Sequence, residues 1–130
     1  MESKEKDNYK NCDYLRIINH DDGSIALCFD IENDKILEIG DEMNDMVEEA
    51  YMNGYNWDAF LHYYLAENAP EILEGMDTDP EAGSYVAYYE GSPENEARAI
   101  RFAELITSLV EDKAKLFKFL QEKGDYIEWD

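Results

Sequence analysis

The chain has 130 residues, of which 45% are hydrophobic and 13% aromatic, and its 11 Lys or Arg residues stand against 32 Asp or Glu residues, giving a formal net charge of −21. This length favours one domain with a hydrophobic core, and the apolar content excludes a disordered acidic tail. A surface of this charge repels nucleic acids and anionic membranes and attracts basic proteins.

The sequence shows no sign of export or membrane insertion. No apolar run reaches the roughly 18 residues of a membrane-spanning helix, and no apolar signal-peptide segment follows Met1. The two cysteines, Cys12 and Cys28, are too few for a disulfide framework. We therefore expect a cytoplasmic protein in which both thiols are reduced and buried.

The first third of the chain predicts a β-hairpin. Residues 1–9 are polar and charged, so we expect a flexible N-terminal segment, followed by a single domain over residues 10–130. Residues 12–18 and 24–31 are rich in strand formers, and the Asp22-Gly23 pair between them is typical of a two-residue turn, which would place Cys28 opposite Ile17. The apolar face of the second strand consists of Ile25, Leu27, Phe29 and Ile31.

Two helices are predicted in the middle of the chain. After a short third strand at residues 36–39, residues 41–53 carry apolar side chains at helical spacing. A second helix starts at Trp57, with Asn56 as its N-cap and Gly54 as the stop of the preceding helix. Its apolar stripe consists of Trp57, Phe60, Leu61, Tyr64 and Leu65.

The rest of the chain predicts one strand and one or two long helices. Pro70 ends the second helix or begins a short new one, and residues 76–83 form an acidic loop. Residues 84–89 form a strand with Tyr85, Ala87 and Tyr89 on one face and Val86 and Tyr88 on the other. From Pro93 onward the apolar spacing fits one long helix or two helices separated at Asp112.

These elements indicate an α+β fold. Hairpin signals and unequal spacings argue against a regular βαβ series. We expect a small antiparallel or mixed sheet packed against several α-helices in a single layer, with the apolar tail at residues 126–129 able to form an edge strand.

No motif for catalysis or cofactor binding is present. The HExxH, CxxC, Walker and GxGxxG patterns are absent. His20 lies in the predicted hairpin turn as a solvated polar residue, and His62 lies on the second predicted helix as a partly buried imidazole. We expect no enzyme activity and no cofactor.

The run from Asp77 through Asp79 to Glu81 has the alternating oxygens of a calcium loop. It departs from the EF-hand pattern, because Ala82 and Tyr88 stand where that loop has Gly and Glu. We therefore expect no bound metal.

Acidic residues are concentrated in the middle of the chain. From residue 36 to residue 97 there are 16 carboxylates and no Lys or Arg. Such a stretch either keeps the protein soluble or steers a basic partner, and nearby exposed tyrosines would be natural anchors. If the second helix continues through Pro70, three of these carboxylates share one helical face. The candidate partner-binding residues are Glu67, Glu71, Glu74, Asp77, Asp79, Glu81, Tyr63 and Tyr88.

A resemblance to a known family rests on three stretches. They are NGYNWDAFLHYYLAENAPEILEGMDTDPEAGSYVAYYEG at residues 53–91, the helix from Pro93, and the terminal DYIEWD, and together they resemble the immunity protein 51 family. That family is associated with bacterial polymorphic toxin systems, including contact-dependent growth inhibition, and is expected to have an α+β fold. The resemblance implies a cytoplasmic protein that binds and neutralises a cognate toxin, and it carries over no functional residues.

Three classes of function remain open. Many toxins of such systems are nucleases with basic clefts, so the first is an immunity protein whose acidic surface covers a basic toxin domain and binds neither nucleic acid nor membrane. The second is an acidic mimic of nucleic acid, or a general protein-binding module, with a different protein as its partner. The third is a carboxylate-based hydrolase or a metal-binding enzyme.

Overall fold

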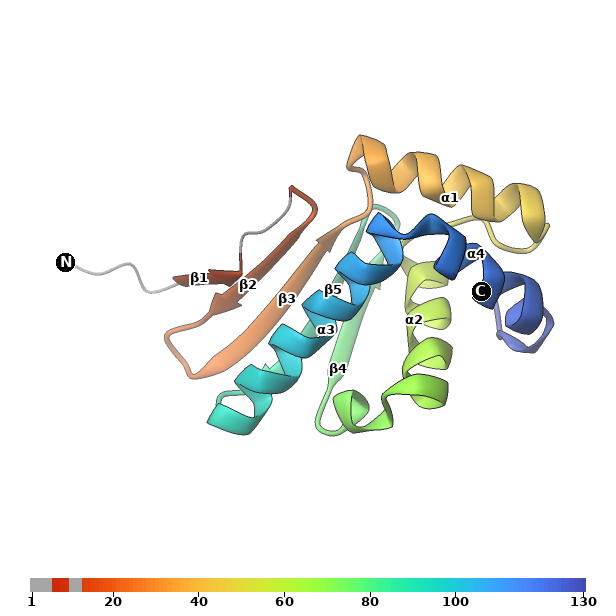
Figure 1. Ribbon diagram of the computed structural model, residues 1–130. Coiled ribbons are helices and arrows are strands. Elements are labelled where there is room, and N and C mark those ends of the chain that lie inside the picture. The colour runs from red at the N-terminus through yellow and green to blue at the C-terminus, as the bar shows by residue number, and fades with distance from the viewer. Residues whose placement is uncertain (1–5, 10–12) are drawn as a thin grey trace.

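Five antiparallel strands form one sheet in the computed structural model, which describes residues 6–9 and 13–130 (Figure 1). The order across the sheet is β1-β2-β3-β5-β4, and every neighbouring pair within the described residues is antiparallel. The strands are β1 (Lys6–Tyr9), β2 (Leu15–Asn19), β3 (Ser24–Asp30), β4 (Asp77–Glu81) and β5 (Ser84–Glu90).

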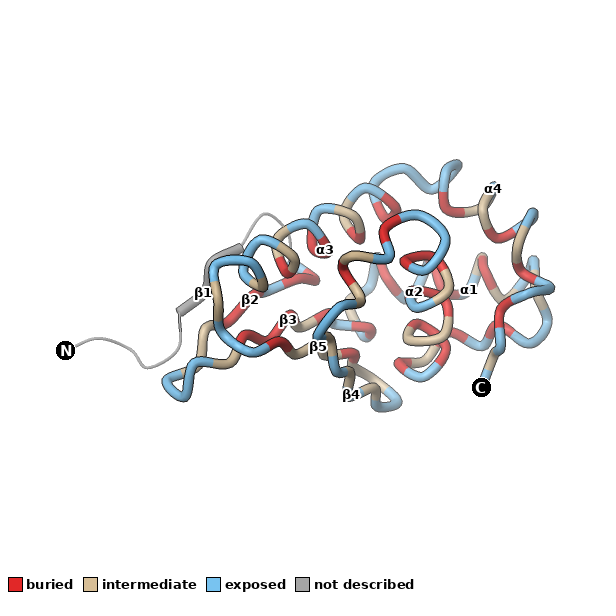
Figure 2. Tube along the Cα trace, turned by 90° about the horizontal axis from the view of Figure 1, so that it is seen from below, coloured by how far each residue is buried: buried red, intermediate tan, exposed pale blue. Residues whose placement is uncertain are grey.

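Four α-helices of the described chain lie on the same side of this sheet, which leaves the other side without a helical layer (Figure 2). They are α1 (Asp34–Met46), α2 (Gly54–Asn68), α3 (Pro93–Glu111) and α4 (Lys113–Lys123), with short 3-10 turns at η1 (Pro70–Leu73) and η2 (Gly124–Tyr126). The predicted α+β fold with one layer of helices is confirmed. No helix of the described part is long and apolar enough to cross a membrane.

The N-terminal segment contains a paired strand. β1 pairs with the outer edge of β2, with Lys6 opposite Asn19. Residues 1–5 and 10–12 lie outside the described residues, and so does Cys12. The flexibility expected for residues 1–9 stays a prediction.

The β2–β3 hairpin has a three-residue loop rather than the predicted two-residue turn. The His20 N–H donates to the Ser24 carbonyl at 2.8 Å, and the Gly23 N–H donates to the His20 carbonyl at 3.0 Å. Gly23 has a φ of 92°, the left-handed conformation that completes a type I turn in such loops. The register therefore shifts by one residue, and Cys28 lies opposite Arg16 instead of Ile17.

The residues predicted as a short third strand belong to α1. Asn33 caps this helix, because its side chain accepts a backbone N–H of the first turn at 2.9 Å. The helical spacing continues through residues 36–39, and the helix ends at Met46 rather than at residue 53. Its buried side is formed by Ile36, Ile39, Gly40 and Met43.

The start of α2 also differs from the prediction. The N-cap is Asn53, whose side chain accepts the Asn56 N–H at 2.9 Å. Gly54 is the first helical residue, and a Cβ there would lie 1.9 Å from the Glu81 carbonyl oxygen and 2.2 Å from that of Ser84. Gly54 is therefore required by the close approach of α2 to the β4–β5 turn, and it does not end the preceding helix.

The predicted acidic loop at residues 76–83 contains strand β4. Asp77 pairs with Tyr88 and Glu81 pairs with Ser84, so residues 82–83 form the turn into β5. β4 is the last strand in the sheet order, and an edge strand is the position at which a sheet tolerates a proline such as Pro80.

Asp112 separates α3 from α4, which resolves the alternative that the spacing left open. Its side chain accepts the Lys115 N–H at 3.3 Å and so caps α4. The predicted edge strand at residues 126–129 is absent from the described chain, which instead forms η2 followed by an irregular segment.

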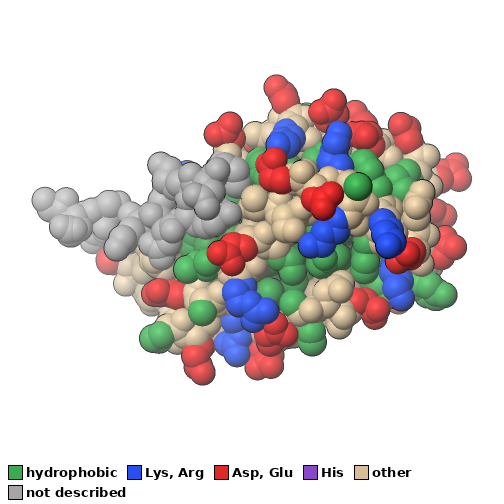
Figure 3. All heavy atoms as spheres, viewed as in Figure 1, with side chains coloured by type: hydrophobic (Ala, Val, Ile, Leu, Met, Phe, Trp, Pro, Cys, Tyr) green, Lys and Arg blue, Asp and Glu red, His purple; other side chains and the backbone are tan. Residues whose placement is uncertain are grey.

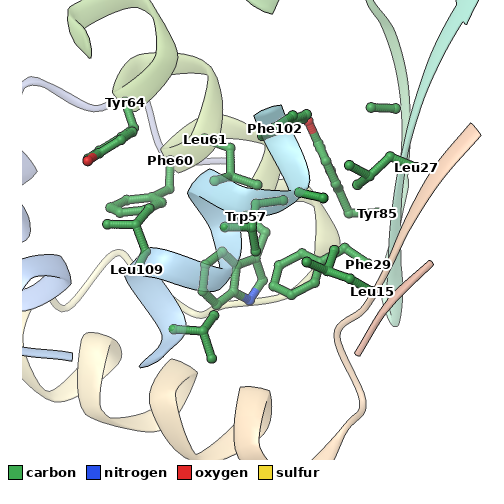
Figure 4. Close-up of a cluster of buried hydrophobic side chains, with 14 of the residues drawn as sticks. Leu15, Leu27, Phe29, Trp57, Phe60, Leu61, Tyr64, Tyr85, Phe102 and Leu109 are labelled. Atoms are coloured by element: carbon green, nitrogen blue, oxygen red, sulfur yellow. The ribbon is translucent and has the colours of Figure 1, made fainter. Parts of the chain in front are cut away.

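The core lies between the sheet and the helices and is built around Trp57 (Figure 4). The ring centroids of Trp57 and Phe29 lie 5.1 Å apart and those of Trp57 and Phe60 lie 5.9 Å apart, both edge to face. The predicted stripe of α2 is buried, as predicted. Trp57 Nε1 and the Tyr85 hydroxyl are buried without a hydrogen-bond partner in the described part, which costs roughly 1–3 kcal/mol for each group.

Candidate interaction surface

The side of the sheet that faces away from the helices is open in the described structure. Alternation along β5 decides what it displays, because Tyr85, Ala87 and Tyr89 point into the core and are at most 2% exposed. Val86 and Tyr88 therefore point outward, and both are partly exposed. This assignment of the two faces of β5 agrees with the sequence prediction.

Three of the predicted carboxylates lie on this open side. Asp77, Asp79 and Glu81 alternate along β4 and are exposed, whereas Thr78 and Pro80 between them are half-buried. Asp77 is paired opposite Tyr88 and Asp79 opposite Val86, so the carboxylates share the outward face of β5. We call the surface formed by Asp77, Asp79, Glu81, Val86 and Tyr88 the acidic sheet face.

The carboxylates also influence Tyr88. Burial raises the pKa of the Tyr88 hydroxyl, and the negative charge of Asp79 is the next largest cause. Tyr88 therefore stays neutral at physiological pH and keeps its O–H as a hydrogen-bond donor. A neutral tyrosine beside exposed carboxylates is a combination that suits a protein interface.

Two shallow hollows lie next to this surface. One, of about 590 Å³, adjoins Asp77 and Tyr88. The other, of about 650 Å³, extends over Arg16, Cys28 and Val86. Cys28 is half-buried, so it is less buried than predicted.

The other three predicted carboxylates form ion pairs within the chain. α2 ends at Asn68, so Glu67, Glu71 and Glu74 do not share a helical face. Instead each forms an ion pair with a cation of α3 or α4. Glu67 pairs with Lys123 at 3.6 Å, Glu74 pairs with Arg98 at 3.4 Å, and Glu71 pairs with Arg101.

Glu71 is the most firmly held of these three carboxylates. A hydrogen bond from its own backbone and a second one from Arg101 lower the pKa of its carboxyl group. Its carbonyl oxygen also accepts a hydrogen bond from Arg98 Nε at 3.1 Å. These contacts tie η1 to α3, which indicates a role in joining elements of the fold.

Tyr63, the remaining predicted residue, lies apart from the acidic sheet face. It is on α2, where its ring centroid is 6.0 Å from that of Phe119. It is half-buried and lines a hollow together with His62 and Tyr126. The structure thus brings together Asp77, Asp79, Glu81 and Tyr88 but separates Tyr63 from them.

The acidic stretch of the sequence is partly neutralised by cations from outside it. Besides the three ion pairs above, Lys113 forms an ion pair with Glu42, with 3.2 Å between Nζ and Oε2. Figure 3 shows the side covered by helices, where Lys and Arg side chains lie among carboxylates. Within the described residues, no ion pair is formed by the three carboxylates of the acidic sheet face.

His62 and Asp58 lie close together on α2. His62 Nδ1 lies 3.4 Å from Asp58 Oδ1, and a hydrogen bond to Asp58 is the main cause that raises the pKa of His62. No cluster of three or more potential metal ligands is present among the described residues. Alternate carboxylates along a strand are roughly 7 Å apart, which is too far for one strand to wrap a calcium ion.

One comparison with known proteins gives a result. The family model of immunity protein 51 matches residues 15–125. No curated protein and no solved structure matches the chain. The matched region includes every element from β2 to α4 and most of η2, so the chain belongs to the immunity protein 51 family.

Proposed function

We propose that this chain neutralises a cognate toxin by binding a basic region of it with the acidic sheet face. Membership in the family implies an immunity protein with a toxin partner. The finer assignments, to a basic, nuclease-type toxin domain and to a complex formed in the cytoplasm, are part of the proposal. It assigns no catalytic step to this chain.

The observation that carries the proposal is the difference between two sets of carboxylates. Glu67, Glu71 and Glu74 already have cationic partners within the chain. The carboxylates of the acidic sheet face are exposed on a side that no described helix covers, and no ion pair is described for them. Unpaired surface charge costs little in the free protein and becomes favourable when a cationic partner approaches.

The partner chemistry follows from charge and shape. A nuclease cleft is basic because it binds phosphates, and a row of carboxylates on a rigid strand can occupy the same positions. Tyr88 adds an aromatic anchor beside the row, and tyrosines are enriched among residues that dominate binding energy. The acidic sheet face thus offers both charge complementarity and an anchor.

The test is a charge reversal with a matched control. The product of the gene upstream of this one is co-expressed with the wild type, with Asp77→Lys/Asp79→Lys/Glu81→Lys, or with Glu38→Lys/Asp41→Lys/Asp45→Lys on the exposed side of α1. Both triple variants change the net charge equally. We expect the sheet variant to lose growth protection and to bind at least about 100-fold more weakly, since close charge pairs contribute several kcal/mol. The α1 variant keeps protection.

Two results would overturn the proposal. If both variants weaken the complex equally, only overall charge matters and the acidic sheet face is not the interface. If the neighbouring protein is not toxic and the chain instead captures a DNA- or RNA-binding protein, the mimic of nucleic acid becomes the better explanation. Circular dichroism of both variants confirms that the fold is retained.

A further inference from the structure

A groove lies between the outer side of α2 and the segment 124–130, and we call it the tail groove. Two adjoining hollows form it, of about 340 Å³ and 460 Å³, and they share Ala59, His62 and Glu128. None of the residues that line it belongs to the acidic sheet face. It is therefore a second concave surface, which the proposal above does not use.

Tyrosine and tryptophan rings line the tail groove. Tyr55 is 43% exposed and Tyr126 is 67% exposed, although large aromatic side chains are normally packed. Tyr63 and Trp129 are half-buried beside them. Exposed aromatics gathered around a hollow are typical of a binding surface.

The charge of the groove selects a cationic occupant. Glu128 and Asp130 contribute exposed carboxylates to its lining, whereas Asp58 is paired with His62. Lys123 Nζ lies over the Tyr126 ring, 5.8 Å from its centroid, a position in which the face of an aromatic ring attracts a cation. A second copy of the chain is a poor occupant, because two molecules of net charge −21 repel each other.

The groove is held in shape by specific hydrogen bonds. Trp129 Nε1 donates to the Gly124 carbonyl at 3.1 Å, and the Asp130 N–H donates to Asn56 Oδ1 at 2.6 Å. Asn56 is itself 2% exposed, and its Nδ2 donates to the Tyr51 carbonyl at 2.8 Å. A wall that is already ordered loses little conformational entropy when a ligand binds.

We propose that the tail groove binds an arginine side chain presented by a protein partner. The planar guanidinium can stack on a tyrosine ring and donate to a carboxylate at the same time, which the compact ammonium of lysine does less well. The site does not require the partner to be the toxin, and so it stands independently of the acidic sheet face.

The test uses a defined probe and the full chain. The ¹⁵N-labelled protein is titrated with the peptide acetyl-Gly-Arg-Gly-amide and, separately, with the same peptide carrying citrulline, which keeps the shape but lacks the charge. We expect saturable shifts at Trp129 Nε1–H and at the amides of residues 55–63 and 124–130. The citrulline peptide should bind about tenfold more weakly or not at all.

Matched variants separate the groove from general charge attraction. Glu128→Gln and Asp79→Asn each remove one negative charge, one inside the groove and one on the acidic sheet face. Glu128→Gln should weaken arginine binding severalfold and Asp79→Asn should leave it unchanged. Tyr55→Ala/Tyr126→Ala should abolish the shifts without unfolding the protein, because both side chains are exposed.

Four outcomes would overturn this proposal: no saturable binding, equal binding of the citrulline peptide, equal losses in Glu128→Gln and Asp79→Asn, or shifts that are spread over the surface or centred on β4. Since no toxin takes part, such a failure leaves the proposed function to its own charge-reversal test.

Discussion

At the scale of single residues, Asp58 influences the protonation of His62. A hydrogen bond to Asp58 and the charge of that carboxylate raise the pKa of His62, while partial burial acts against them. Replacing Asp58 with Asn removes the charge, so burial then dominates. We expect the pKa of His62 to fall in Asp58→Asn, measured by NMR titration of the imidazole ring protons.

The imidazole signals of the two histidines are distinguished by assignment, since His20 lies in the β2–β3 loop and His62 lies on α2. Because the pKa of His62 is raised in the folded protein, the direction in which stability changes with pH is known. The Asp58–His62 pair stabilises the fold below the unfolded-state pKa of histidine, and this contribution disappears as the pH rises through the folded-state pKa.

The size of that contribution is small, because the His62 side chain is 52% exposed and solvent screens the pair. Between about pH 5 and pH 8, the free energy of unfolding of the wild type should therefore fall by less than about 1 kcal/mol relative to that of Asp58→Asn. Urea unfolding at each pH measures this difference. A pKa of His62 that stays raised in Asp58→Asn would show that the cause lies elsewhere.

At the scale of elements, the docking of α2 against the β4–β5 turn depends on Gly54. A Cβ at Gly54 would collide with two backbone carbonyl oxygens, which cannot move without separating α2 from the turn. We expect Gly54→Ala to lower the free energy of unfolding by at least about 2 kcal/mol, as overpacking of a rigid contact does. Chemical denaturation measures this change.

Gly124→Ala is the matched control. A Cβ at Gly124 would meet a methyl group of the Val47 side chain at 3.2 Å rather than backbone atoms, and the backbone at Gly124 is already in the right-handed helical region. Alanine should therefore change stability by no more than about 1 kcal/mol in either direction. Equal losses in the two variants would contradict the assignment of Gly54 to a close approach.

The same scale shows what the sequence could predict. Strong periodicity identified the buried stripe of α2 and the two faces of β5, because burial selects apolar residues at fixed spacing. Signals carried by one or two residues were less informative. Asp22-Gly23 fits both a two-residue and a three-residue loop, and the two loops place different residues opposite Cys28 in the hairpin.

The strand β4 was missed for a related reason. Its outward positions are all carboxylates and its inward positions are Thr78 and Pro80, so local composition is typical of a loop. Only its pairing with β5 makes it a strand. The tail groove was missed as well, although Tyr55, Ala59 and His62 are spaced as one face of a helix, because the segment that closes it is distant in sequence.

At the scale of the whole molecule, an acidic stretch of sequence does not predict which face of the molecule is acidic. The 62 residues between Lys35 and Arg98 contain no cation, but the fold brings cations of α3 and α4 against the carboxylates of α1, α2 and η1. The sequence predicted a strong acidic field and could not assign it to a face. The structure divides the candidate carboxylates into paired and unpaired sets, and this division singles out β4.

The net charge of −21 predicts how a basic toxin would find this protein. Long-range attraction raises association rates by roughly 10- to 1,000-fold, and it is screened over about 10 Å at 0.1 M salt and about 3 Å at 1 M. We expect the association rate with the cognate toxin, measured by stopped-flow fluorescence, to fall at least about tenfold between 0.05 M and 0.5 M salt, whereas the dissociation rate changes less.

The two triple charge-reversal variants distinguish attraction by the net charge of the whole molecule from direct contacts made by the acidic sheet face. Each adds six units of positive charge, so both should reduce the salt dependence of association to a similar extent. Only Asp77→Lys/Asp79→Lys/Glu81→Lys should also raise the dissociation rate, because it alone removes contacts made in the complex. An association rate that does not respond to salt would mean that attraction over a distance plays no part, and the acidity of this chain would then serve solubility alone.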